Sequence, residues 1–146
     1  SLKKAFELGK MDKDLIAVVR FQGPQACGMP ELHQLITYLG ILQDRGFKVA
    51  LVTDGRLSGA SGKVPAATKL CPEAKTGGLI AKIQNGDLIV LDCEQKMLEL
   101  MVDEKELNQR ELALLNNTQG DYGMGRELFS GMRERVSSAE LGATTF

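Results

Sequence analysis

Two apolar runs on either side of an amphipathic segment constrain the fold of this chain more than any other feature. The runs cover Leu15 to Phe21 and Phe47 to Thr53, and their β-branched residues between turn formers are typical of buried strands. Between them, five apolar residues recur at helical spacing: Leu32, Leu35, Ile36, Leu39 and Leu42. Pro30 fits the first turn of this helix, and Gly46 fits the residue after its end. The pattern predicts a βαβ unit with parallel strands.

The rest of the chain predicts shorter elements around this unit. We expect a helix over residues 1–10, short strands over 79–83, 88–91 and 97–102, and helices ending near Leu115 and Val136. Asn85-Gly86 predicts a hairpin turn between the first two of these strands. Asp103 and Glu106 form a helix-capping pattern, whereas the glycines and proline of residues 22–28 predict an irregular loop. We expect one α/β domain over residues 1–146, with a mixed sheet or small barrel and flanking helices.

Composition and charge exclude several classes of function. The chain has a net charge of −1 and no Trp, so neither a basic nucleic-acid surface nor a base-stacking platform is expected. No apolar run approaches the roughly 20 residues that a membrane span requires, and no secretory signal is recognisable. We therefore expect a cytoplasmic protein that binds neither nucleic acid nor membrane.

The three cysteines are far apart and form no CxxC pair. This spacing indicates a reducing compartment and argues against a zinc or iron–sulfur site built from this chain alone. Cys71 and Cys93 stand among apolar residues and are predicted to fill the core. Cys27 stands in the loop after the first strand, without a neighbouring cation that would make its thiolate reactive.

The loop from Asp54 to Lys63 holds most of the residues suited to chemistry. It contains three glycines and two serines and follows the end of a predicted strand, where open α/β sheets bind ligands. The glycines allow backbone N–H groups to approach an anion, and Ser58 and Ser61 can contact a substrate. Arg56 and Lys63 add charge that suits a carboxylate or phosphate. The alternative is a surface loop whose glycines only form turns.

Glu31 is predicted to lie just inside the helix of the βαβ unit. Its carboxylate either complements the helix dipole or binds a metal or substrate. Because loops that follow parallel strands leave the same edge of a sheet, Glu31 and Ser58 are expected near each other. A serine hydroxyl acts as a base only beside a cation, a metal or N–H donors, and this chain offers no metal cage. His33, the only histidine, faces away from the apolar stripe and is predicted to be exposed.

Several long motifs resemble one enzyme family, the dihydroxy-acid/phosphogluconate dehydratases. The segments that carry the resemblance are residues 18–26 (VVRFQGPQA), 28–32 (GMPEL), 52–67 (VTDGRLSGASGKVPAA), 72–74 (PEA), 86–87 (GD) and 123–129 (GMGRELF). They are ordered along nearly the whole chain. The runs FQGPQ at 21–25 and GASGKVPAA at 59–67 are similar to the phosphogluconate branch. That resemblance implies the dehydration of 6-phosphogluconate to 2-keto-3-deoxy-6-phosphogluconate, the entry step of the Entner–Doudoroff pathway.

The resemblance also implies a swivelling β/β/α domain at the C-terminal end of a larger enzyme. The missing N-terminal domain is expected to hold an iron–sulfur cluster of the 4Fe-4S type, so the isolated chain is expected to be inactive. Ser58 matches the family's proton acceptor, and Glu31 matches its acidic ligand for a divalent cation such as Mg²⁺. The cysteines of this chain match none of the cluster ligands. The expected partners are the N-terminal domain, a phosphorylated sugar acid and a second copy in a homodimer.

Two positions depart from the family's pattern. Lys69 stands where a histidine is usual, and Leu79 stands where a proline is usual. The first departure bears on substrate preference rather than on the fold. Two alternatives stay open: dehydration of another sugar acid or a branched dihydroxy acid, and an anion-binding module that performs no chemistry.

Overall fold

A three-stranded parallel sheet lies at the centre of the fold. The computed structural model describes residues 2–57, 62–115, 123 and 125–146. Strands β1 (Leu15–Val19), β2 (Val49–Thr53) and β3 (Ala66–Ala67) follow the order β1-β2-β3. β1 pairs in parallel with β2 from Leu15 opposite Val49 to Val19 opposite Thr53, which confirms the predicted βαβ unit. β3 was not predicted, because two alanines carry no periodic signal.

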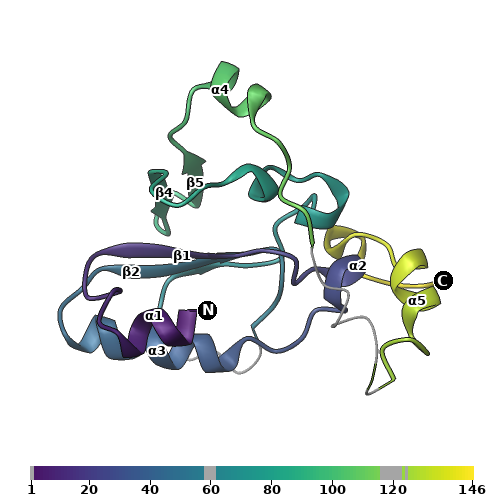
Figure 1. The fold of residues 1–146 in the computed structure, drawn as a ribbon, viewed down its shortest axis with the longest axis horizontal. Coiled ribbons are helices and arrows are strands. Elements are labelled where there is room, and N and C mark those ends of the chain that lie inside the picture. The colour runs from purple at the N-terminus through teal and green to yellow at the C-terminus, as the bar shows by residue number, and fades with distance from the viewer. Residues whose placement is uncertain (1, 58–61, 116–122, 124) are drawn as a thin grey trace.

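Helices α1 (Leu2–Glu7) and α3 (His33–Asp44) cover one face of this sheet (Figure 1). The core on this face is made of residues that are almost fully buried: Met11, Ala17, Leu39, Leu42, Val49, Leu51 and Val64. All five residues of β2 are buried, whereas in β1 only Ala17 is. The prediction of a buried first strand is therefore only partly right, because β1 lies at the sheet edge and β2 has a strand on each side.

Helix α3 begins later than the sequence predicts. Its first residue is His33, and the backbone of Glu31 instead forms an isolated parallel bridge with Arg56. A residue held in extended pairing cannot also form the first helical turn, so the placement of Pro30 and Glu31 inside the helix is wrong. Gly46 follows the helix with φ 95°, as predicted for a glycine at a helix end.

A short helix, α2 (Pro24–Cys27), occupies the segment that was predicted to be an irregular loop. Pro24 at its first position and Gly28 in the left-handed conformation after it suit the two ends of a helix. The N–H groups of Gln25 and Ala26 bind the carboxylate of Glu73 at 3.0 and 2.7 Å. Glu73 belongs to a distant segment, so no local sequence pattern predicts the helix.

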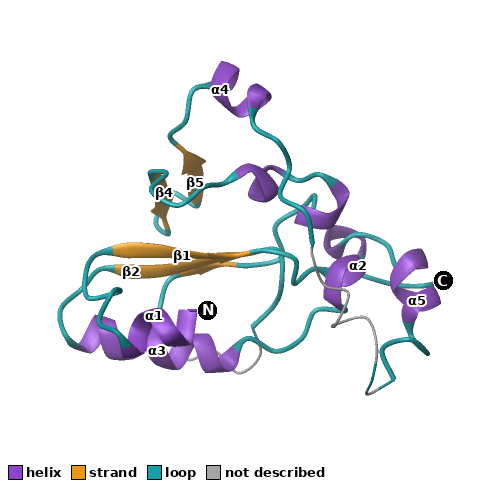
Figure 2. Ribbon diagram, in the orientation of Figure 1, coloured by secondary structure: helices purple, strands orange, loops and turns teal. Residues whose placement is uncertain are grey.

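Two 3₁₀ helices and a hairpin lie over the opposite face of the sheet (Figure 2). They are η1 (Ala74–Thr76), η2 (Leu79–Lys82) and the antiparallel strands β4 (Ile89–Asp92) and β5 (Met97–Leu100). The predicted strand over 79–83 is thus wrong, and the hairpin turn lies at residues 93–96 rather than at Asn85-Gly86. Ile80 and Ala81 are buried against Val52 in a second core cluster, which explains their apolar character without a strand.

The α/β class with flanking helices is confirmed, but the strands lie in two separate sheets and no barrel closes within the described ranges. Helix α4 (Glu104–Gln109) begins where predicted, because the side chain of Asp103 accepts the N–H of Lys105 at 2.8 Å. It ends well before Leu115. The chain closes with α5 (Ser130–Arg135), shorter than predicted, and η3 (Ala139–Leu141). The predicted linker 116–122 lies outside the described residues.

The prediction that two cysteines fill the core is wrong. Cys93 is exposed in the turn between β4 and β5, and Cys71 is only half-buried before η1. Apolar sequence neighbours do not bury a side chain at a turn, where the chain reverses direction. His33 is exposed, as predicted. In the part of the chain that the structure describes, no helix has the length and apolar character needed to span a bilayer.

Candidate functional site

Asp54 joins three segments that are far apart in the sequence and meet beyond the carboxyl ends of β1 and β2. Its side chain is fully buried and accepts the N–H groups of Phe21 at 3.0 Å, Gln22 at 2.9 Å and Ala74 at 2.9 Å. A buried carboxylate is tolerated only when hydrogen bonds replace its water, and these three donors do so. Asp54 therefore fixes the loop after β1, the loop after β2 and η1 relative to one another.

Glu73, the residue before η1, makes a second buried connection to the same region. Glu73 is only 5% exposed, and its two carboxylate oxygens accept the N–H groups at the start of α2. Gly23 lies against this carboxylate: a Cβ added there would be 2.5 Å from Glu73 Oε2. Glu73 thus holds α2 beside the loops that Asp54 organises, and Gly23 makes the close approach possible.

The glycine-rich loop leaves β2 in a direction that its neighbours determine. The N–H of Gly55 donates to Thr53 Oγ1 at 3.0 Å, and the Gly55 carbonyl accepts the N–H of Lys69 at 2.8 Å. A Cβ on Gly55 would lie 2.6 Å from the Cβ of Gln22. The first residues of the loop are therefore packed between the segment after β1 and the segment after β3.

Two of the predicted site residues, Glu31 and Arg56, lie side by side. Their backbones form the parallel bridge, and Arg56 Nη1 is 3.4 Å from Glu31 Oε2. Arg56 Nε donates to the carbonyl of Met29 at 2.8 Å, which fixes the guanidinium. The side chains of Arg56 and Glu31 are 42% and 33% exposed, so a ligand can reach both. The structure thus pairs a carboxylate with a cation at the predicted sheet edge.

Ser58, Ser61 and Lys63 are the other predicted site residues. Ser58 and Ser61 lie outside the described residues, so their roles stay predictions. Lys63 Nζ is 2.6 and 2.7 Å from the two carboxylate oxygens of Asp44, the last residue of α3. Because α3 is about 18 Å long, the structure does not bring Lys63 to Glu31, which precedes the other end of that helix.

This chain supplies at most part of a metal site within its described residues. Glu31 is an accessible carboxylate, and oxygen ligands of this kind suit a hard divalent cation. No group of three or more His, Cys, Asp or Glu side chains gathers within the described ranges. Cys27, Cys71 and Cys93 occur in α2, before η1 and in the β4–β5 turn. They do not fit as the joint ligands of an iron–sulfur cluster, whereas Glu31 fits as one ligand of a divalent cation.

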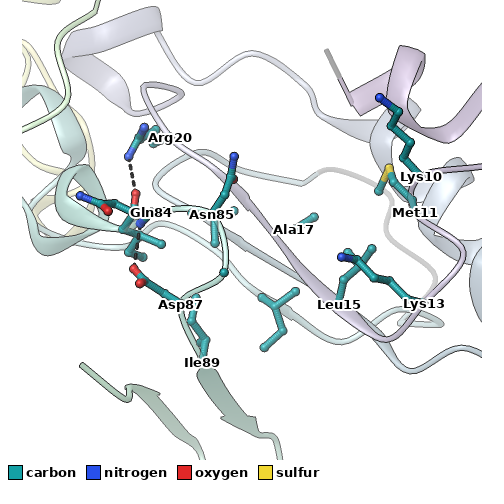
Figure 3. A pocket seen from close by; sticks show the side chains of 14 residues that line it. Lys10, Met11, Lys13, Leu15, Ala17, Arg20, Gln84, Asn85, Asp87 and Ile89 are labelled. Carbon is teal, nitrogen blue, oxygen red and sulfur yellow. Dashed lines mark hydrogen bonds between the residues drawn. The ribbon is translucent and has the colours of Figure 1, made fainter. Parts of the chain in front are cut away.

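A cavity of about 500 Å³ lies elsewhere, between β1 and the segment that joins η2 to β4 (Figure 3). Lys10 and Lys13 line one side of it, and residues 83–87 line the other. Arg20 also lines it, but its Nη1 donates to two carbonyls of the η2 segment at 2.8 and 3.3 Å. Arg20 therefore anchors η2 to β1. Because this cavity extends toward the amino end of β1, away from the Glu31–Arg56 pair, we do not assign it as the site.

The segment beside that cavity is held by an ion pair. Arg110 Nη1 is 2.6 Å from Asp87, and Arg110 Nη2 is 2.5 Å from Glu106. The hydrogen bond from Arg110 and that from the N–H of Gln84 lower the pKa of Asp87, and the carboxylates of Asp87 and Glu106 raise the pKa of Arg110. The pair fastens α4 to the chain before β4, so its role is structural.

Sequence reasoning missed Asp54 and Glu73 as residues that build the site. Both lie in segments that carry the family resemblance, and Asp54 directly follows a buried strand. These positions could have indicated a structural role, because a carboxylate beside a buried strand needs hydrogen-bond donors. The donors are backbone N–H groups of distant segments, which no sequence pattern displays.

Comparison with known proteins identifies the family of this chain. The model of the family described as dihydroxy-acid/6-phosphogluconate dehydratase C-terminal matches residues 1–143. A phosphogluconate dehydratase from Pseudomonas aeruginosa is 56% identical over 146 residues, which cover 100% of this chain and 24% of that protein. One from Escherichia coli K12 is 56% identical over 140 residues, 96% of this chain and 23% of that protein. A dihydroxy-acid dehydratase from Ignicoccus hospitalis is 44% identical over 109 residues, 73% of this chain and 19% of that protein.

The chain belongs to the dihydroxy-acid/6-phosphogluconate dehydratase family and corresponds to its C-terminal part. It spans about a quarter of the length of the phosphogluconate dehydratases that it matches. The family resemblance that the sequence motifs indicated is confirmed.

Proposed function

We propose that this chain forms the C-terminal part of a hydro-lyase that converts 6-phosphogluconate to 2-keto-3-deoxy-6-phosphogluconate, a step of the Entner–Doudoroff pathway. The observation that carries the proposal is the meeting of the family segments 18–26, 28–32, 52–57 and 72–74 beyond the carboxyl ends of β1 and β2. Identity of 56% to two phosphogluconate dehydratases, against 44% to a dihydroxy-acid dehydratase, favours the phosphogluconate branch.

The reaction removes a proton from C2 and releases the C3 hydroxyl as water. A C2–C3 double bond forms, and the resulting enol becomes the 2-keto acid. Ser58 is the proposed proton acceptor, on the strength of its match to the family motif. A serine needs nearby positive charge to accept a proton, and Arg56, two residues earlier in the same loop, contributes such charge. Ser61 and Lys63 are proposed substrate contacts, and Lys63 would have to leave Asp44 to reach a substrate at Glu31.

Glu31 is the proposed ligand of a divalent cation such as Mg²⁺, with the other ligands supplied by the rest of the enzyme. Such a cation, when bound, stabilises the negative charge that develops as C2 loses its proton. Glu31 suits this task because its carboxylate is accessible and its backbone is held by the bridge to Arg56. Arg56 is itself held by the Met29 carbonyl, so it orients the carboxylate and leaves N–H groups for an anionic substrate.

The remaining components are proposed to belong to the rest of the enzyme. An iron–sulfur cluster, expected to be 4Fe-4S, would be held by an N-terminal domain, because the cysteines of this chain do not fit together as its ligands. We further propose a homodimeric, cytoplasmic enzyme. Because the proposed site needs both domains, this chain by itself is expected to show no turnover.

A substrate panel on the complete enzyme tests the proposal. The panel compares 6-phosphogluconate, gluconate and a branched dihydroxy acid, with kcat/KM as the measured quantity. We expect 6-phosphogluconate to exceed the other two by at least about tenfold. A preference for the branched dihydroxy acid would assign the chain to the other branch, and no turnover of any of the three would contradict an enzymatic role. Turnover by the isolated chain would contradict the two-domain site.

A further inference from the structure

A second, smaller cavity lies between α2 and α5, close to the Glu31–Arg56 pair. Its volume is about 340 Å³, within the range of small-molecule sites. Six of its lining residues carry the argument: Cys27, Gly28, Arg126, Phe129, Met132 and Arg133. The two walls are tied together, because Gln25 Nε2 donates to the carbonyl of Val136 at 3.0 Å. The cavity is therefore formed by tertiary packing between segments about a hundred residues apart.

Arg126 is the unusual residue of this cavity. Its Nη1 is 3.7 Å from Cys27 Sγ, and its Nε is buried without a hydrogen-bond partner in the part of the chain that the structure describes. A buried N–H of a guanidinium without an acceptor is costly, so the described residues leave part of the hydrogen-bonding capacity of Arg126 unused. A phosphate offers two oxygens that match the fork of a guanidinium.

A second cation and a lack of competing acids support the same ligand. Arg133 lines the cavity with Arg126, and no Asp or Glu is among the described residues that line it. Glu127, next to Arg126 in the chain, is engaged elsewhere, because its Oε2 accepts the N–H of Gly123 at 2.8 Å. Two arginines that line one cavity, with no carboxylate among its described lining residues, favour a doubly charged anion.

The cavity also lies at a suitable place relative to the proposed site. Gly28 in its wall precedes Glu31 by three residues, and Arg56 binds the carbonyl of Met29 between them. One short segment thus separates the Arg126 cavity from the Glu31–Arg56 pair. A 6-phosphorylated sugar acid has its carboxylate at one end of the carbon chain and its phosphate at the other, so it requires two such anion sites.

We propose that Arg126 and Arg133 bind the phosphate of the substrate, while Glu31 and Arg56 lie at the end that reacts. This inference rests on the proposed function, because it assigns the two ends of a phosphorylated sugar acid to the Arg126 cavity and to the Glu31–Arg56 pair. It also gives segment 123–129, which carries part of the family resemblance, a role in substrate choice.

The test compares Arg126→Gln and Arg133→Gln with Arg135→Gln in the complete enzyme. Arg135 is the matched control, because it lies on α5, is exposed and does not line the cavity. The measurements are KM and kcat for 6-phosphogluconate, kcat/KM for gluconate, and inhibition by inorganic phosphate. Loss of charge-assisted hydrogen bonds should raise KM for 6-phosphogluconate by about 10- to 100-fold in Arg126→Gln. The preference for 6-phosphogluconate over gluconate and the inhibition by phosphate should fall with it, and Arg133→Gln should show the same change to a smaller degree.

Three results would overturn the proposal. The first is that both variants match Arg135→Gln. The second is that Arg126→Gln lowers activity equally for phosphorylated and unphosphorylated acids, and that Arg126→Lys, which keeps the charge, does not recover the KM for 6-phosphogluconate; this result would indicate a structural role. The third is that Arg126→Gln does not fold and Arg133→Gln leaves phosphate inhibition intact.

Failure of the proposed function gives a different result. The wild-type enzyme would then not dehydrate 6-phosphogluconate but would act on another acid. Inhibition of that reaction by inorganic phosphate, lost in Arg126→Gln, would still support the phosphate site. Its absence in the wild type would overturn the site as well.

Discussion

Glu31 and Arg56 belong to different loops, yet they are paired both through their backbones and through side chains 3.4 Å apart. The bridge lies outside the named strands, and it keeps Glu31 out of helix α3. It therefore places an accessible carboxylate beside the start of the glycine-rich loop. The predictions that follow test this arrangement and the residues that hold it.

Replacing Glu31 with Gln should weaken the dependence of the enzyme on its divalent cation. The amide keeps the shape of the side chain but removes its charge, and a lost ligand should raise the Mg²⁺ concentration for half-maximal activity by at least about tenfold. The measurement is a Mg²⁺ titration of chelator-treated complete enzyme. Glu94→Gln, in the exposed β4–β5 turn, is the control and should leave the titration unchanged. An unchanged curve for Glu31→Gln would remove Glu31 from the metal site.

Ser58→Ala and Ser61→Ala should have different kinetic effects. If Ser58 accepts the C2 proton, its loss should lower kcat by at least about a hundredfold, whereas loss of a substrate contact at Ser61 should act mainly on KM. Steady-state kinetics of both variants of the complete enzyme distinguish these outcomes, with circular dichroism and the cluster absorption spectrum as folding controls. Retained turnover in Ser58→Ala would exclude it as the base.

Asp54→Asn should destabilise the protein although it changes no exposed residue. The amide can accept at only one of its two positions, so the three N–H groups of Phe21, Gln22 and Ala74 cannot all keep their acceptor. We expect a loss of about 3 kcal/mol, seen as a lower urea midpoint for the complete enzyme.

Asp12→Asn is the matched control for that experiment. Asp12 forms an exposed ion pair with Arg45 at 3.0 Å, so its replacement should cost no more than about 1 kcal/mol. Equal midpoints for the two variants would contradict the assigned role of Asp54.

Gly55→Ala should disturb the start of the loop, because the added Cβ would lie 2.6 Å from the Cβ of Gln22 and 3.1 Å from its carbonyl oxygen. We expect a lower melting temperature and a lower kcat together. Gly131→Ala is the matched control: Gly131 lies in α5 and its added Cβ would meet nothing within 4 Å. That change should be neutral or stabilising by about 0.5–1 kcal/mol, because Ala is the better helix former. Tolerance of Gly55→Ala would show that the contact can relax.

The Asp87–Arg110 ion pair should make the stability of the folded protein depend on pH. Arg110 lowers the pKa of Asp87 below its ordinary value of 3.8. The folded protein therefore holds the charged carboxylate more strongly than the unfolded chain does, and the stabilisation is fully present above pH 3.8 and lost as pH falls through the lower folded value. Melting temperatures between pH 6 and pH 3 should fall more steeply in the wild type than in Asp87→Asn. Parallel curves would mean that the pair contributes no pH-dependent stability.

Much of the fold could be predicted because it follows from local periodicity. The apolar runs of β1 and β2 and the helical spacing of α3 are repeated signals, and the Asp103 cap is a local hydrogen bond. The prediction failed where a distant partner decided the conformation. Residues 79–82 form η2 because Ile80 and Ala81 pack against Val52, and α2 forms because Glu73 accepts its first N–H groups.

The sequence by itself determined the βαβ unit, the family and the residue types that the chemistry needs, because these depend on spacing and on motifs that are continuous in the chain. Only the tertiary structure decided that Glu31 pairs with Arg56, that Lys63 binds Asp44 instead, and that Arg126 meets Cys27. Each of these contacts joins residues that are distant in sequence. They depend on hydrogen bonds, ion pairs and packing between distant segments, and a linear pattern does not contain that information.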